Sequence, residues 1–171
     1  AQPLMIPVYW LFLAGLVLGT FVDFEHFIIP DSVTIGGMAA GPLLSALVPA
    51  LHGQGLWWQG LRSSGIGLLA GFGLLYAVGW IGTRAFKKEA MGFGDVKLMG
   101  AIGAFLGWKA VLFTIFASSL LGSVAGVLLI AFGGVKLQSR IPFGPYISLA
   151  AAIWLFWGET LFALYVNLLR P

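Results

Sequence analysis

The sequence has no cysteine and few charges. Its 171 residues include nine Lys or Arg, six Asp or Glu and two histidines. The absence of cysteine excludes disulfides, thiolate nucleophiles and cysteine-ligated metals. The two histidines, His26 and His52, cannot form a zinc site alone. A formal net charge of +3 is too small and too scattered to indicate a nucleic-acid partner.

The scarcity of charge also excludes a soluble globule. Charged residues make up 9% of the chain, whereas soluble domains carry roughly 25%. A compact domain of this size leaves about 30% of its extended-chain surface in water, which so few charges cannot cover. The apolar runs are continuous and do not alternate with period two, which favours helices over a membrane β-barrel. The sequence therefore predicts an all-α, polytopic membrane bundle.

Polar clusters divide the chain into about six expected transmembrane helices, because one span needs about 20 apolar residues. The expected spans are residues 4–22, 33–51, 65–83, 96–108, 110–132 and 147–169. The fourth is too short to cross alone, since 13 residues rise only about 20 Å. Either Asp95 and Lys97 begin a helix sunk below the membrane surface, or residues 98–132 form one long helix and the number of spans is five. We expect one integral membrane domain over residues 1–171. Spacings such as Gly67/Gly71 and Gly103/Gly107 are typical of close helix packing.

Lys and Arg are distributed unequally between the two sets of loops. One set carries Arg84, Lys87, Lys88, Lys97, Lys136 and Arg140, and the other carries Arg62, Lys109 and Arg170. Because cytoplasmic loops are rich in Lys and Arg, the loops around Asp23, Asp95 and Arg140 are predicted to face the cytosol. Two clear spans separate Asp23 from Asp95, so both carboxylates are expected on the same side.

The six acidic residues differ in their surroundings. Asp31 follows Pro30 at a predicted helix start, where an Asp accepts hydrogen bonds from the first free amides. Glu89 lies beside two lysines and is expected to be a solvated loop charge. Glu159 follows a glycine in the last apolar run, and the sequence indicates no function for it.

Asp95 stands out because residues 92–97 read Gly-Phe-Gly-Asp-Val-Lys. The two glycines permit backbone angles closed to other residues and let another chain approach closely. Asp95 is expected at a helix N-terminus, where the helix dipole favours its ionised form. Lys97 offsets this charge or anchors the helix at the lipid headgroups. A structural cap and a catalytic role both remain open for Asp95 from spacing alone.

Pairing Asp95 with Asp23 sharpens the catalytic hypothesis. Two carboxylates held close together cannot both ionise at modest cost, so one keeps a proton while the other activates water. Two carboxyl groups in these roles can hydrolyse an amide without serine or cysteine. We expect neither a metal nor a cofactor.

Three segments carry a family pattern in order along the chain. They are residues 23–31 (Asp-Phe-Glu-His-Phe-Ile-Ile-Pro-Asp), residues 92–97 and residues 141–146 (Ile-Pro-Phe-Gly-Pro-Tyr). Together they resemble the type IV prepilin peptidases, membrane aspartyl proteases of the Gly-x-Gly-Asp class. The resemblance implies that Asp23 and Asp95 are the catalytic pair. It also implies an endopeptidase of the bacterial inner membrane that removes the short basic leader of a prepilin or pseudopilin. The cut would follow a glycine at the cytosolic face, just before the substrate's hydrophobic helix.

The same resemblance implies residues that bind the substrate or support the site. Acidic side chains at Glu25, Asp31 or Glu89 would lie near the basic leader, and an extended substrate would pass the open backbone of Gly92 and Gly94. The remaining expected site residues are Lys97, Pro142, Gly144 and Pro145.

This sequence departs from the family pattern in places. Bacterial members commonly carry an N-terminal cytosolic portion with two Cys-x-x-Cys pairs, which is absent here. We expect either a member of a shorter, cysteine-free branch or a fragment, and the start Ala1-Gln2-Pro3 favours a fragment or processed product. Many long members also methylate the new N-terminus, an activity that the resemblance does not carry onto this chain. Glu25 stands where a second Asp is frequent.

Two other functions use the same acids. A transporter or channel subunit would use Asp23 and Asp95 as a proton or cation relay. A non-catalytic assembly scaffold for a pilus or secretion system would use them to bind a basic partner tail. Relay acids usually lie near the membrane midplane, whereas these acids are expected at span ends, which favours hydrolysis at the membrane border.

Overall fold

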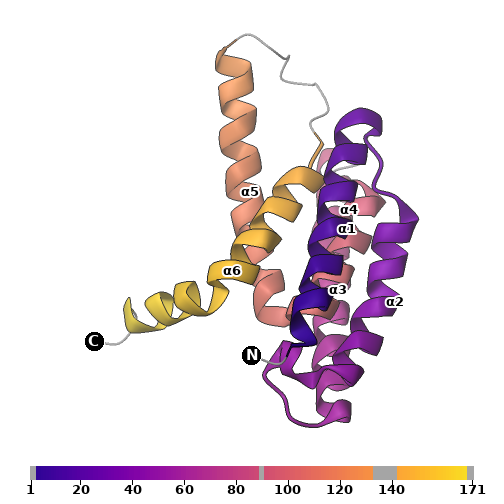
Figure 1. Cartoon of the computed structure of the whole chain (residues 1–171). Coiled ribbons are helices and arrows are strands. Elements are labelled where there is room, and N and C mark those ends of the chain that lie inside the picture. Colours follow the sequence, from indigo (N-terminus) through magenta and orange to yellow (C-terminus); the bar gives the residue numbers. More distant parts are fainter. Residues whose placement is uncertain (1–2, 89–90, 133–141, 169–171) are drawn as a thin grey trace.

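The protein is a bundle of helices (Figure 1). A computed structural model describes residues 3–88, 91–132 and 142–168. Within these ranges there is no strand, and the all-α prediction is confirmed. The elements are α1 (Met5–His26), α2 (Asp31–Leu47), the short 3-10 helix η1 (Pro49–His52), α3 (Trp57–Phe86), α4 (Phe93–Leu106), α5 (Trp108–Ala131) and α6 (Gly144–Leu168).

Four of these helices, α1, α3, α5 and α6, are long and apolar enough to cross a membrane. The protein is therefore a multi-pass membrane protein. The helices α2 and α4 are shorter, at 17 and 14 residues. Six α-helices match the expected number of elements in the described residues, but the expectation of about six full spans is not confirmed.

The chain breaks between α4 and α5 at Gly107. This residue has a φ of 82° and a ψ of 173°, a conformation that residues with a side chain rarely adopt. Its N–H donates to the carbonyl of Gly103, 2.8 Å away. The interpretation of residues 98–132 as one long helix is therefore wrong. The short helix α4 is a separate element, as the first interpretation had it.

The helices also extend into segments that were expected to be polar loops. Helix α3 begins at Trp57, within the predicted loop of residues 52–64, and it continues to Phe86. Helix α4 begins at Phe93, between the expected spans of residues 65–83 and 96–108. The apolar runs predicted only the most apolar part of each helix, because a helix can continue into a stretch that contains polar residues.

Helix α4 is the centre of the bundle, packed between α2 and α3. Its residues from Leu98 to Phe105 are all buried. At the crossing with α3 the two backbones touch, because a Cβ atom on Gly67 would overlap the carbonyl group of Gly103. A Cβ atom on Gly71 would likewise overlap the carbonyl oxygen of Met99. The close packing predicted from the glycine spacing is confirmed at Gly67, Gly71 and Gly103.

The substitution Gly67→Ala tests this backbone contact. We expect it to lower the thermal unfolding temperature of the detergent-purified protein, because α3 and α4 must separate at a cost of about 1–3 kcal/mol. Gly73→Ala is the matched control, since a Cβ there meets nothing within 4 Å. The control should keep or slightly raise the unfolding temperature, because Ala favours a helix over Gly. Equal effects of the two substitutions would contradict the contact.

Candidate active site

Asp23 lies in the last turn of α1, near the end of the bundle where α2, α4 and α6 begin (top of Figure 1). Helix α1 ends at Phe27, which takes a left-handed conformation and donates its N–H to the carbonyl of Asp23 at 2.9 Å. The Asp23 residue is buried, with 5% of its surface exposed. Its Oδ2 atom accepts a hydrogen bond of 3.0 Å from the N–H of Gly144 at the start of α6. The acid therefore joins the end of α1 to the beginning of α6.

Gly144 has no room for a side chain. A Cβ atom there would lie 2.6 Å from Oδ2 of Asp23 and 3.1 Å from Cδ1 of Ile29. Glycine lets the α6 backbone approach the carboxylate closely enough for its N–H to donate. Gly144 was predicted as a supporting residue, and its contact with Asp23 is direct.

Asp95 lies in the first turn of α4, after the N-cap residue Gly92. It is 8% exposed, and it lines the same cavity of about 440 Å³ as Asp23. Burial, together with the nearby charge of Asp23, raises the pKa of Asp95 to about 7. A backbone hydrogen bond from Gly92 acts in the opposite direction and is outweighed. Asp95 lies at a helix N-terminus, as expected, and its burial there acts against the ionised form that a helix dipole favours.

The cavity is formed by the turn between α1 and α2 and by the first turn of α4. Of the predicted site residues it includes Asp23, Asp31, Gly92, Gly94, Asp95 and Lys97. Residues from α1, α2 and α4 thus line one cavity. The two aspartates lie on the same side of the bundle, as expected from the sequence. The acids come from segments far apart in the sequence, so the fold brings them together.

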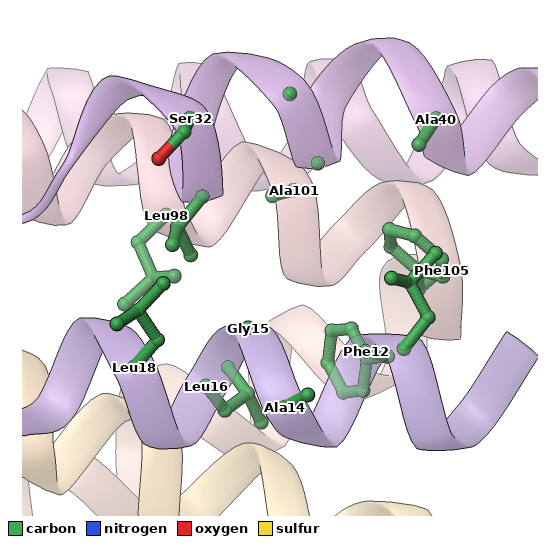
Figure 2. A pocket seen from close by; sticks show the side chains of 14 residues that line it. Phe12, Ala14, Gly15, Leu16, Leu18, Ser32, Ala40, Leu98, Ala101 and Phe105 are labelled. Carbon is green, nitrogen blue, oxygen red and sulfur yellow. The ribbon is translucent and has the colours of Figure 1, made fainter.

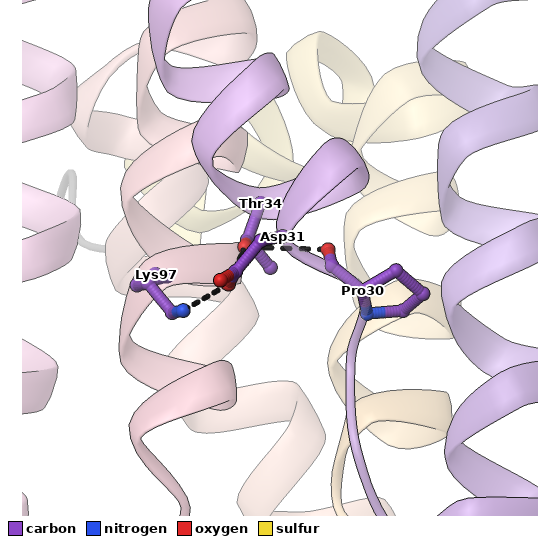
Figure 3. A network of polar contacts seen from close by, with 4 residues as sticks. All are labelled: Pro30, Asp31, Thr34 and Lys97. Carbon is purple, nitrogen blue, oxygen red and sulfur yellow. Dashed lines mark hydrogen bonds and ion pairs between the residues drawn. The ribbon is translucent and has the colours of Figure 1, made fainter.

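Lys97 pairs with Asp31, and this ion pair joins the N-terminal part of α4 to the first turn of α2 (Figure 3). The lysine holds the pKa of Asp31 below its usual range. Thr34 donates to the same carboxylate at 3.4 Å. The cap at the start of α2 is Pro30, with no side-chain cap bond, so the expected capping role of Asp31 is wrong. The partner of Lys97 is Asp31, where the sequence had suggested Asp95 or the headgroups.

Other predicted site residues lie outside the cavity. Glu25 is exposed, and its Oε2 atom lies 3.9 Å from Nδ1 of the neighbouring His26. Pro145 is buried in the first turn of α6, and Pro142 precedes that helix without lining the cavity. Glu89 lies outside the described residues.

Ile29 is a site residue that the sequence analysis missed. It lines the cavity and is 4% exposed. A Cβ atom on Gly94 would lie 3.4 Å from Cβ of Ile29, and the side chain also lies against Gly144. Ile29 thus fills the space between the backbones of α4 and α6 beside the two acids. Its position directly before Pro30, within the family pattern of residues 23–31, was the available signal.

The described part of the chain contains no group of three or more His, Asp or Glu side chains able to hold a metal ion.

The fold and the site define a class: a multi-pass membrane protein with two buried aspartates in one cavity at one end of its helical bundle. Comparison with known proteins identifies the family within this class. The model of the type IV leader peptidase family matches residues 10–127, well over half of the chain. The protein belongs to this family.

Curated relatives agree with the family assignment. The chain is 35% identical to the prepilin leader peptidase/N-methyltransferase of Aeromonas salmonicida over 156 residues, which cover 89% of the chain and 50% of the relative. It is 34% identical to the protein of the same name from Pseudomonas aeruginosa, covering 90% of the chain and 50% of the relative. The chain therefore spans about half the length of these relatives. No solved structure matches it at a significant level.

The substitution Asp95→Asn tests the raised pKa. An Asp with a pKa raised in the folded state destabilises the protein progressively as pH rises from the unfolded value of 3.8 to about 7, and the full cost persists above that. An Asn carries no such cost. We expect the gain in unfolding temperature of Asp95→Asn over wild type to be several degrees larger at pH 8 than at pH 5, since about 1 kcal/mol shifts it by about 2–4 °C. A gain that does not change with pH would contradict the raised pKa.

The substitution Gly144→Ala tests the contact between α6 and Asp23. The added Cβ pushes α6 away from the carboxylate, and we expect a loss of about 1–3 kcal/mol in stability, measured by thermal unfolding. Gly65→Ala is the control, because a Cβ at that position in α3 meets nothing within 4 Å. If Gly144→Ala were as stable as the control, the close approach at Asp23 would be wrong.

Proposed function

We propose that this chain is the peptidase portion of a prepilin leader peptidase. It would be an aspartyl endopeptidase of the bacterial inner membrane that removes the short basic leader of a prepilin or pseudopilin, cutting after a glycine. The observation that carries the proposal is the burial of Asp23 and Asp95 around one cavity. We propose a single domain over residues 1–171. The methylation named in the relatives is outside this proposal.

The different surroundings of the two acids support a division of catalytic roles. Asp95, with a pKa of about 7, holds the shared proton near neutral pH and donates it to the carbonyl oxygen of the scissile peptide. Asp23, which accepts the Gly144 N–H, takes a proton from the attacking water, whose oxygen bonds to the carbonyl carbon. In the collapse of this intermediate, the proton on Asp23 passes to the leaving nitrogen, the C–N bond breaks, and the proton from the diol returns to Asp95.

The charges around the cavity support cytosolic presentation of a basic leader. Asp31 lies at the rim of the cavity, and Glu25 is exposed on the last turn of α1 nearby. Basic residues lie just after α3 and near the start of α4 at this end. Exposed tryptophans lie at the starts of α3 and α5, at the opposite end. An excess of Lys and Arg is typical of the cytosolic side, and tryptophan is typical of membrane interfaces.

The position of the two aspartates also favours a peptidase over a transporter that uses them as a proton or cation relay. Relay acids in transporters lie near the membrane midplane between broken helices. Asp23 and Asp95 lie at the end of α1 and the beginning of α4. This favours chemistry at the membrane border over ion transfer across it.

The proposal is tested by cleavage of a purified type IV prepilin, reconstituted with the purified chain in lipid vesicles in the presence of a chelator. We expect Asp23→Asn and Asp95→Asn each to lower the cleavage rate by about 100-fold or more, because each acid moves a proton in the reaction. The wild-type rate should fall as pH rises above about 7, where Asp95 loses its proton.

The control is Asp31→Asn, which changes an acid of the same cavity that the mechanism does not use. We expect a modest reduction in its rate, through the lost pair with Lys97. Near wild-type cleavage by either Asp23→Asn or Asp95→Asn would overturn the catalytic pair. Complete loss of activity in a well-folded Asp31→Asn protein would contradict the assignment of the proton transfers to Asp23 and Asp95 alone.

A further inference from the structure

An apolar groove of about 420 Å³ lies between α1 and α2, with α4 behind it (Figure 2). Phe12 and Leu16 of α1 and Phe105 of α4 form buried parts of its walls. Leu11 and Leu18 line it while remaining more than half exposed. The groove therefore has a packed floor and an open side in a protein that lies in lipid.

The groove adjoins the cavity of the two aspartates at two places. On α2, Asp31 lines the cavity and the next residues, Ser32 and Val33, line the groove. On α4, Lys97 lines the cavity and Leu98 lines the groove. The groove therefore begins at the residues that directly follow those of the cavity on both α2 and α4.

Helix α2 has two neighbouring rows of small residues, and the space beside one of them is open. A Cβ atom on Gly37 would lie 2.9 Å from Cβ of Ala101, so this row packs against α4. A Cβ atom on Gly36 would meet nothing within 4 Å, although Gly36 and Ala40 both line the groove. Small residues four positions apart let a second helix approach closely within a membrane.

The geometry points to this groove as the binding site for the apolar helix of the substrate, an inference that rests on the proposed function. The reacting peptide bond lies in the cavity between Asp23 and Asp95, and the helix that follows it descends along α1 and α2. Leu11 to Leu18 spans about 10 Å at about 1.5 Å per residue, so the groove holds about two turns of this helix. The acidic residues at the mouth leave the basic leader on the polar side and the apolar helix on the lipid side.

Photo-crosslinking tests the occupant directly. A photoreactive amino acid replaces Gly36 in the full chain carrying Asp95→Asn, which keeps the substrate uncut. The protein is reconstituted with a purified type IV prepilin in vesicles of phosphatidylethanolamine and phosphatidylglycerol. We expect crosslinks to the first two turns of the prepilin's apolar helix, and none from the same amino acid at Gly73, an equally open position on α3. Crosslinks from position 36 to lipid alone, or to the prepilin equally from both positions, would overturn the inference.

Kinetics supply the second test. Gly36→Leu fills the groove without touching the acids, and we expect the KM for the prepilin to rise by about tenfold or more while kcat stays close to wild type. Gly73→Leu should leave both constants unchanged. An unchanged KM in Gly36→Leu, or a fall in kcat alone, would overturn the groove as the helix site. If the wild-type chain cut no prepilin, the proposed function would fail, and the crosslinking experiment would still decide what occupies the groove.

Discussion

Burial of two carboxylates in one cavity is the constraint on which the site depends. Asp23 and Asp95 are both nearly inaccessible, and such a space does not tolerate two full charges at neutral pH. The Gly144 N–H stabilises a charge on Asp23, while burial and that charge keep the proton on Asp95 up to about pH 7. The same desolvation that costs stability therefore leaves one carboxyl group protonated and the other ionised, as the proposed mechanism requires.

The fold serves this constraint through close backbone approaches. Gly144 brings α6 onto Asp23, and the Gly67–Gly103 crossing fixes α4 against α3. Because α4 packs against several other helices, Asp95 in its first turn has a defined position. The ion pair of Asp31 and Lys97 adds a tie between α2 and α4 at the rim of the cavity. The geometry of this site thus depends on glycines as much as on acids.

Much of this arrangement was predictable from the sequence. The scarcity of charge indicated a helical membrane bundle, and the parity of the apolar runs put Asp23 and Asp95 at the same end. The number of spans was not predictable, because the apolar residues of α4, a helix of 14 residues, are buried by other helices. Helix α2 has only 17 residues, although its apolar residues Ile35, Leu43 and Leu47 are exposed. The partner of Lys97 and the roles of Ile29 and Gly144 depend on contacts between distant segments, which hydrophobic periodicity does not contain.

The central claim is that the buried pair keeps one proton near neutral pH. Infrared difference spectroscopy, recorded while the purified protein is titrated, measures it directly through the carbonyl band of a protonated carboxyl group. The account predicts that such a band is present at pH 6, that it disappears with a midpoint near pH 7, and that it is absent in Asp95→Asn. A wild-type protein with both aspartates ionised at pH 6 would contradict the account.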